Sequence, residues 1–291
     1  MKKILLLLFI SQLSFCFADK SPRATSANSK DFAYSKDVCP NKFYTEFDYL
    51  LMNFFEDGLE YALIIDGKNN NSQRDQKFNS GVRMTLGLPF SKCRPNDPKI
   101  EFSWTYIKMK RSSDTVTMNT IHNLFLPPQF LTSSRASESL SGNFNTIDLN
   151  FLKPHHVSKY YISTPELGIR GALIYQDLKV IYTIVNTLNT VSGKNNYWGI
   201  GFLAGYKANF IISSHYSIYA KSAFSLLYGR TKVAQASDIP ITLLSQYNLK
   251  EKIYSVMPNT EMAIGLSFDK PFNHNKKKLS IKVGYEFHHF W

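Results

Sequence analysis

The sequence predicts an all-β fold, a transmembrane antiparallel β-barrel of about ten strands, with eight and twelve strands as alternatives. Three observations lead to this prediction. The chain opens with a short apolar segment typical of an export signal, its remainder has no apolar run long enough for a membrane-spanning helix, and apolar and polar residues alternate through most of it. Alternation with a period of two is the pattern of a strand, because successive side chains point to opposite faces.

The first segment has the pattern of a secretion signal. Lys2 and Lys3 precede an apolar run that reaches Phe17, and the small Ala18 follows where a signal peptidase would cut. The run has roughly 14 residues, against the roughly 20 that a membrane-spanning helix needs. We therefore expect residues 1–18 to be removed, Cys16 with them, because the bulky Phe15 before Cys16 argues against a lipoprotein. Residues 19–42, rich in Ser, Asn and Lys, predict a flexible tail.

The barrel is expected over residues 43–291, and the segment 81–90 illustrates the pattern. There Val82, Met84 and Leu86 share one face, while Arg83 and Thr85 share the other. The same alternation recurs at 43–51, 100–106, 147–151, 198–210, 262–268 and 281–291. The segment 198–210 is long enough to cross a bilayer as a tilted strand, which a small soluble sandwich rarely needs.

The connections and strand ends favour a membrane barrel over a soluble sandwich. Aromatic residues stand near strand ends at Phe43, Phe90, Trp198, Tyr228 and Phe268, as an interfacial girdle requires. Brief connections near 91–98, 153–159 and 213–216 alternate with long polar ones at 65–78, 112–142 and 230–249. We therefore expect short periplasmic turns and long extracellular loops.

The strand number follows from a parity argument. Counting only the clearest segments gives nine, which would leave the two chain ends on opposite sides of the membrane, whereas bacterial single-chain barrels usually have an even number of strands. Residues 250–256 followed by Met257-Pro258-Asn259 read as a descending strand and a turn, which brings the expected number to about ten.

The formal net charge of +12 indicates polyanionic partners. Nucleic acid is a poor candidate, because an exported chain does not meet it and no basic helix or RNA-binding motif is present. We expect the lysines to face outer-membrane lipid and lipopolysaccharide. The alternative is that lysines such as Lys276, Lys277 and Lys278 only keep loops solvated.

Charged residues on the polar faces of the strands are the candidate site. In a pore they would set ion selectivity, whereas in a narrow barrel they would pair with one another and fill the interior. The predicted lumen-lining charges are Glu46, Asp48, Arg83, Glu101, Asp148, Glu166, Arg170, Lys207, Lys221, Glu261, Lys282 and Glu286.

The cysteines and histidines give no clear indication of a catalytic or metal site. Cys39 and Cys93 fall at the periplasmic ends of neighbouring strands, where they either form a disulfide or stay free. His215 and Ser217 have a spacing used by lipid A deacylases, but the sequence offers no acid partner, so we predict no enzyme. The pairs His155-His156 and His288-His289 read as interfacial residues, and no nucleotide or metal motif is present. We predict no metal site and no cofactor.

The last strand carries Tyr285, Phe287 and Trp291 on alternate positions and is expected to be an assembly signal read by the barrel-assembly machinery of the outer membrane. His289 departs from the aromatic residue usual at the third position from the end.

In its segments and their order, the chain resembles the Legionella-type major outer-membrane protein family, which also occurs in environmental chlamydiae. The resemblance rests on residues 43–63, 165–182, 197–210, 217–230, 261–268 and 284–291. Leu51-Met52 and Leu173 depart from it, since the family favours Trp there. The resemblance implies an integral outer-membrane barrel with a porin-like role, passing ions or small solutes. A plugged structural barrel, or an adhesin-like barrel that presents its loops, is the alternative, and self-association stays open.

Overall fold

The computed structural model describes residues 4–17, 43–56, 60–66, 69–70, 78–90, 97–126, 132–184, 187–238, 247–272 and 277–291; for 4–17, 117–119 and a few strand ends it describes the backbone only. These residues form thirteen strands, and none of them belongs to a helix that is long and apolar enough to cross a membrane. The predicted tail at 19–42, with Cys39, and the turn that holds Cys93 lie outside the described residues.

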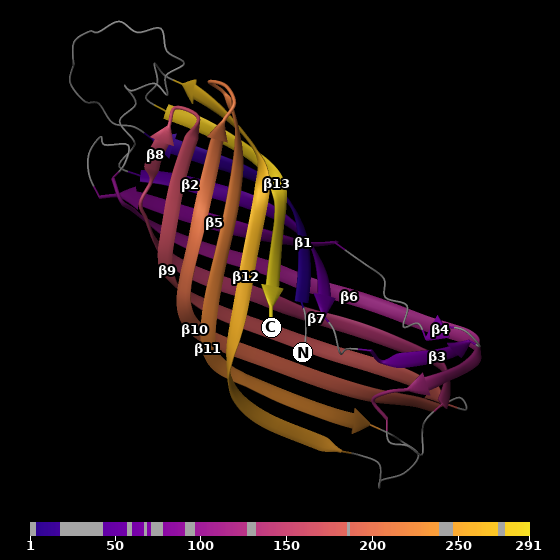
Figure 1. The fold of residues 1–291 in the computed structure, drawn as a ribbon. Coiled ribbons are helices and arrows are strands. Elements are labelled where there is room, and N and C mark those ends of the chain that lie inside the picture. Colours follow the sequence, from indigo (N-terminus) through magenta and orange to yellow (C-terminus); the bar gives the residue numbers. More distant parts are fainter. Residues whose placement is uncertain are drawn as a thin grey trace, which may run out of the picture.

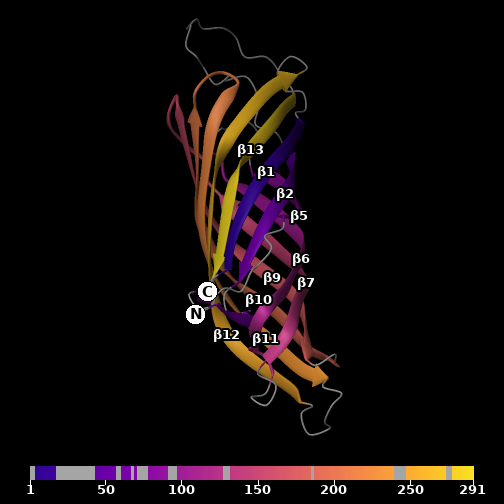
Figure 2. The ribbon, with the colours of Figure 1, turned by 90° about the vertical axis from the view of Figure 1, so that its right-hand side faces the viewer.

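Ten strands form a closed antiparallel ring (Figures 1 and 2). In ring order these are β1 (Ile4–Phe17), β2 (Phe43–Glu56), β5 (Phe78–Pro89), β6 (Lys99–Asn123), β7 (Thr132–Leu152), β9 (Tyr161–Ile184), β10 (Thr187–Ile211), β11 (Tyr216–Asp238), β12 (Asn248–Phe272) and β13 (Lys277–Phe290). The short β3 (Ala62–Asp66) pairs with the end of β6 and with β4 (Asn69–Asn70), and β8 (His155–Ser158) pairs with β9. The predicted β-barrel is therefore confirmed.

The tenth strand of the ring is not the one that the sequence predicted. β12 runs without a break through Pro258, so the expected turn at 257–259 is wrong. The ring instead includes β1, from the predicted signal peptide, between β2 and β13. Whether residues 1–18 are cleaved stays a prediction.

The wall of the barrel is much taller on one side. β1, β2, β5 and β13 have 12 to 14 residues, whereas β6, β7 and β9 to β12 have 21 to 25. We call the projecting part the extension: residues 108–123, 132–142, 176–184, 187–195, 230–238 and 248–253. The segments 112–142 and 230–249, predicted as long loops, are therefore mostly strand.

Pro258 marks the place where the wall drops to the shorter side. The backbone N–H of Trp291 donates to the Pro258 carbonyl at 3.1 Å, and β13 ends beside it. The N–H and C=O of one strand residue point to the same side of the strand, which for Pro258 is the side of β13. The N–H that proline lacks would therefore point to the end of β13, where no further hydrogen bond between the strands is needed. Beyond this point β12 pairs, among the described residues, only with β11.

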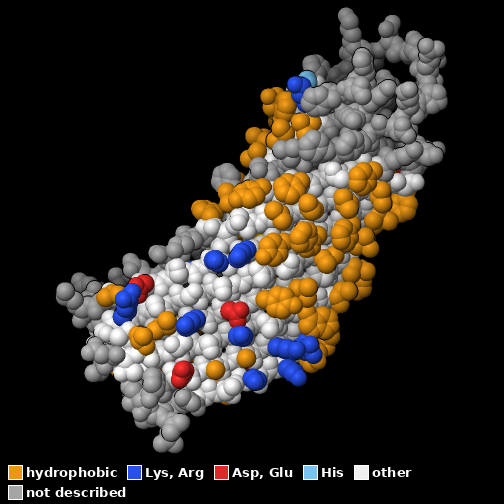
Figure 3. All heavy atoms as spheres, turned by 180° about the vertical axis from the view of Figure 1, so that it is seen from behind, with side chains coloured by type: hydrophobic (Ala, Val, Ile, Leu, Met, Phe, Trp, Pro, Cys, Tyr) orange, Lys and Arg blue, Asp and Glu red, His pale blue; other side chains and the backbone are white. Residues whose placement is uncertain are grey.

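An apolar band covers the outside of the barrel next to the short turns. On β10 the outward side chains Trp198, Ile200, Phe202 and Phe210 are all 46 to 80% exposed. From Trp198 to Phe210 the strand rises about 40 Å, or about 28 Å if tilted by about 45°, close to the height of a lipid-facing band. Figure 3 shows hydrophobic side chains gathered over one half of the visible face and cations along and beyond their border.

Aromatic residues edge this band at both ends. At the short turns the rings of Phe90 and Phe151, Tyr161 and Phe210, and Tyr216 and Phe268 lie 4.8 to 6.0 Å apart. Tyr106, Tyr175, Trp198, Tyr228 and Tyr254 stand where the extension begins. Aromatic rings at two levels are the arrangement that the two surfaces of a bilayer favour.

Candidate functional site: the charged interior of the barrel

All twelve charges predicted to line the lumen form ion pairs inside the barrel. Ten of them make one connected network with His288, while Glu46 and Lys282 form a separate pair beside it, and we call these thirteen residues the charge belt. Each belt residue occupies the strand position that alternates with the exposed apolar residues, so the pleat of the sheet turns it inward.

Arg170 connects opposite parts of the belt. Its Nε and Nη2 each donate to Asp148 at 2.6 Å, and Asp148 is its direct neighbour across β7 and β9. Its Nη1 donates to Asn259 at 2.9 Å and to Glu261, both on β12. Since β9 and β12 stand three positions apart in the ring, these side chains meet across the lumen.

Two further ion pairs cross the interior in the same way. Arg83 of β5 donates from Nη1 and Nη2 to Glu286 of β13 at 2.9 and 2.5 Å, and Lys207 of β10 donates to Glu101 of β6 at 2.6 Å. In each case the two strands are again three positions apart. The ion pairs therefore tie the wall together across its interior as well as along it.

The remaining lysines bridge carboxylates that lie closer in the ring. Lys221 Nζ lies 3.2 Å from Glu261 and 3.8 Å from Glu166, and Lys207 also contacts Glu166 at 3.3 Å. Lys282 donates to Glu46 at 3.2 Å. Glu166 is thus shared by two lysines, although neither of its carboxylate oxygens has a hydrogen-bond partner within the described chain.

His288 was not among the predicted site residues, and its expected interfacial position is wrong. The side chain is 4% exposed, and its Nδ1 and Nε2 lie 3.1 Å from Glu261 and 2.5 Å from Glu286. The signal was present in the sequence, because His288 has the same strand parity as Glu286. His289 points the other way and stacks on Trp291.

Glu261, Glu286 and His288 have ligand atoms close enough together to hold a metal ion. Arg170 and Arg83 already pair with the two carboxylates. Two permanent guanidinium charges beside the carboxylates oppose a further cation, so the three residues fit an ion-pair network better than a metal centre.

Little solvent reaches the belt. Asp48 and Glu166 are 1% exposed, Arg170 and Glu261 are 3% exposed, and the most exposed side chain in these ion pairs, Lys207, is 29% exposed. Buried charges of this kind are stable only with partners, and each belt residue has at least one.

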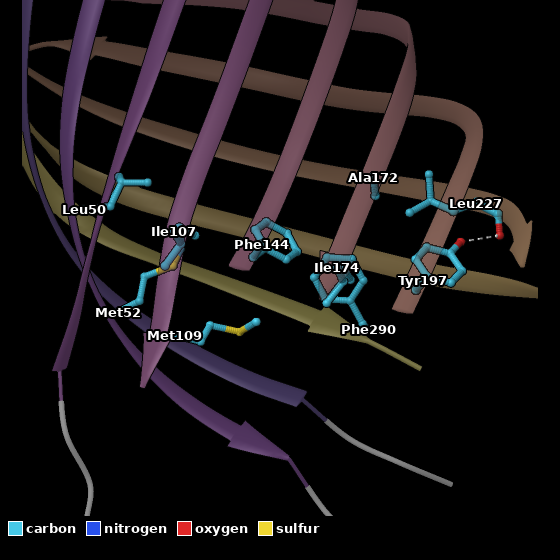
Figure 4. Packing of buried hydrophobic residues seen from close by; sticks show 10 residues of the cluster. All are labelled: Leu50, Met52, Ile107, Met109, Phe144, Ala172, Ile174, Tyr197, Leu227 and Phe290. Atoms are coloured by element: carbon cyan, nitrogen blue, oxygen red, sulfur yellow. Dashed lines mark hydrogen bonds between the residues drawn. The ribbon is translucent and has the colours of Figure 1, made fainter. Parts of the chain in front are cut away.

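An apolar layer packs inside the barrel (Figure 4), and along each strand its members lie nearer to the extension than the belt residues do. Ile107, Phe144, Ile174, Tyr197 and Phe290 come from strands all around the ring, and the rings of Phe144 and Phe290 meet edge to face at 5.5 Å. The other members are Leu50, Met52, Met109, Ala172 and Leu227. The layer places buried apolar side chains directly above the charges.

A second apolar cluster lies inside the extension, around Tyr61, Ile121, Val180 and Tyr182. The Tyr182 hydroxyl donates to the Tyr61 carbonyl at 2.6 Å, and the Tyr61 hydroxyl reaches Ser113 at 3.0 Å. Burial raises the pKa of the Tyr182 phenol above its usual range. This cluster anchors β3 and its neighbours against the inner face of the extension.

The other candidates do not form a site. His215 lies in the exposed turn 212–215, where its Nδ1 is 2.8 Å from the Ser214 hydroxyl and its ring stacks on Phe268. Ser217 is the second residue of β11, and within the described chain neither residue has a carboxylate as a hydrogen-bond partner. Tyr285 and Trp291, of the expected assembly signal, are 50% and 44% exposed on the outer face, and Phe287 shares their side of β13.

The sequence matches the model of a family described as the Legionella pneumophila major outer membrane protein precursor over residues 27–291. The chain belongs to this family. It is accordingly an integral protein of the outer membrane, as the alternating strands predicted. No curated protein matches the sequence.

The chain also matches solved structures, among them the following three. The outer membrane protease OmpT from Escherichia coli is 10% identical, with 99% of this chain and 94% of that chain covered and a TM-score of 0.35. A FadL homologue of Pseudomonas aeruginosa is 5% identical, with 99% and 88% covered and a TM-score of 0.26. The P. putida toluene transporter TodX is 6% identical, with 99% and 89% covered and a TM-score of 0.17. Similarity at this level carries nothing about the activity of this chain.

Proposed function

We propose that this member of the major outer membrane protein family is a barrel with a closed lumen at rest, a structural protein of the outer membrane that presents its extension outside the cell. The observation that carries the proposal is the set of three ion pairs that cross the interior, from Arg170, Arg83 and Lys207. The proposal includes no catalytic activity and no cofactor.

Barrel size supports the closed state. Barrels of about eight strands have an interior that side chains fill, whereas those with 16 to 18 strands leave an aqueous channel. A ring of ten strands, or of nine once residues 1–18 are removed, is near the filled end of this range. Here the charge belt and the apolar layer occupy successive levels of the same interior.

A narrow porin-like pore is the second candidate, and Glu166 is the observation that favours it. Its carboxylate is shared between Lys207 and Lys221 by ionic contacts of 3.3 and 3.8 Å, without a hydrogen bond in the described chain. Loosely shared pairs can exchange partners at small cost. If the apolar layer also moved, the belt would line the path and set the ion preference.

Single-channel recording in planar bilayers distinguishes the two candidates. We expect the wild-type protein to give no conductance steps, while its heat-modifiable mobility on gels demonstrates that it is folded. Replacing Phe144 and Phe290 by Ala together with K207Q/E101Q removes two large rings from the apolar layer and one cross-lumen ion pair from the belt, and should produce steps.

Regular steps from the wild-type protein would overturn the closed barrel and support the pore. In that case the paired variant K207Q/E101Q should change the ion preference, because it removes one cross-lumen ion pair without leaving a lone charge. The matched control K194Q/D177Q removes an exposed ion pair of the extension and should leave the preference unchanged.

A further inference from the structure

Four cations lie together on β11 and β12 where the extension begins: Arg230, Lys232, Lys250 and Lys252. Lys232 and Lys252 are direct partners in the strand register, with Arg230 opposite Tyr254 and Lys250 opposite Ala234. All four occupy even-numbered positions, so they share one face of the sheet, and the three lysines are exposed. We call this surface the basic patch.

The basic patch stands at the level where lipid head groups are expected. It directly follows the aromatic residues Trp198, Tyr228 and Tyr254, which end the apolar band and are 46 to 60% exposed. The Arg230 guanidinium lies over the Trp198 ring, 6.0 Å from its centroid. Aromatic rings followed by cations are typical of a protein at the boundary between acyl chains and charged head groups.

Among the residues that the structure describes, the cations of the patch have no anionic partner. Within the described part of the chain, Lys232, Lys250 and Lys252 form no ion pair, and the Nε of Arg230 is shielded from solvent without a hydrogen-bond partner. Like charges that face each other across two strands destabilise the pair, so Lys232 opposite Lys252 is unfavourable as it stands.

Two other cations of the extension have acidic partners, while the exposed Lys108, Lys110 and Lys179 form no ion pair within the described chain but each lie opposite uncharged residues in the strand register. Arg135 is held by both carboxylate oxygens of Asp114, and Lys194 lies 3.9 Å from Asp177. Glu251 is the acidic residue nearest in sequence to the patch, and its odd-numbered position places it on the opposite face of β12.

We propose that the basic patch binds the phosphate groups of lipid A in the outer leaflet. A phosphate between Lys232 and Lys252 would relieve their repulsion, and Arg230 would offer its planar fork to the same group. The acyl chains would lie along the apolar outer face that continues from the patch through Tyr228 and Val256. This inference does not depend on whether the lumen is open; it uses the proposed orientation, with the extension outside.

The test is a titration of the purified, folded full-length protein with bis-phosphorylated lipid A, followed by native mass spectrometry. The variant K232Q/K252Q should bind about tenfold more weakly, since each cation near an anionic lipid surface contributes substantially. The control K153Q/K159Q removes two exposed lysines at the short-turn end and should bind like wild type. Parallel titrations use dephosphorylated lipid A, phosphatidylglycerol and inorganic phosphate.

Each outcome decides the proposal. A loss of affinity confined to K232Q/K252Q and to phosphorylated lipid A supports it. Equal binding by the variant and wild type would overturn it, and protection of the edge of β12 from pairing with other chains would then be the simpler role of these lysines. Equal affinity for phosphatidylglycerol, or binding of phosphate alone, would also overturn it by removing the specificity for lipid A.

Discussion

At the residue scale, strand parity identified the charge belt but not its pairs. Glu101 and Lys207, for example, are 106 positions apart in sequence and could be placed on the inner face by alternation alone. Which of them meet depends on the order and stagger of the strands around the ring, and a local pattern contains neither quantity. His288 was missed for a different reason: its neighbour His289 made the pair look like an interfacial motif.

Arg170 should be the belt residue whose loss costs most. Arg170→Gln leaves Asp148 and Glu261 buried with less compensation, so we expect the free energy of unfolding to fall by about 3 to 5 kcal/mol. Urea unfolding in detergent micelles, followed by tryptophan fluorescence, measures this change. Arg135→Gln is the matched control, because its ion pair with Asp114 is exposed, and it should leave the urea midpoint unchanged. Equal midpoints for the two variants would contradict the role of the belt.

Gly284 is needed for space inside the lumen. A Cβ there would overlap the Tyr219 hydroxyl and the Ile264 carbonyl, and the latter is backbone that cannot give way easily. We expect Gly284→Ala to destabilise the barrel by about 1 to 3 kcal/mol, as overpacking does. At Gly193 the nearest atom to an added Cβ is 3.6 Å away, so Gly193→Ala should be tolerated. Thermal shifts of the heat-modifiable gel band compare the two, and a Gly284 variant as stable as the Gly193 variant would show that Tyr219 moves freely.

At the element scale, the sequence correctly predicted the strand segments of the apolar band but predicted loops where the strands continue into the extension. In the band, lipid demands apolar outward residues, so alternation is visible in the sequence. In the extension the outward positions of β6 are Lys108, Lys110 and Ser112, and the inward Arg111 and Ser113 are polar too. Because both faces of the strand are polar there, apolar and polar residues no longer alternate along the sequence. Such a segment has the composition of a loop and is predicted as one.

The place of β1 gives a prediction about the mature chain. Both β2 and β13 are antiparallel to β1, so they run parallel to each other. If residues 1–18 are removed, as we propose, β2 and β13 become neighbours in a ring of nine strands. Tyr49 and Val283 face the same β1 residue, Ser11, and their Cα atoms would approach from about 10 Å to about 5 Å.

A cysteine pair tests this rearrangement. In a background without Cys39 and Cys93, the variant Y49C/V283C should form a disulfide in the outer membrane, because two Cα atoms must come within about 7 Å. Gel mobility with and without reductant, together with the mass of the protein, reports the result. If the mass shows that residues 1–18 have been removed but no disulfide forms at this pair, another segment must occupy the place of β1.

At the scale of the whole molecule, the interior is filled in layers while the exterior is divided in two. The belt, the apolar layer and the cluster around Tyr182 succeed one another along the barrel. Outside, the apolar band near the short turns is followed by the polar surface of the extension. Sequence and family could place the chain in the outer membrane, but neither fixes which end of the barrel faces the cell exterior.

The orientation can be measured with one cysteine at each end of the barrel. Lys194 lies on the extension with 69% of its side chain exposed, and Lys159 lies in the turn between β8 and β9. With Cys39 and Cys93 replaced by Ser, K194C should react with a large membrane-impermeant maleimide in intact cells, whereas K159C should react only after the outer membrane is permeabilised. The expectation follows from barrel topology, in which long hairpins stand outside and short turns face the periplasm. The reverse labelling pattern would place the extension in the periplasm, and the basic patch would then face the inner leaflet, where lipid A is not its neighbour.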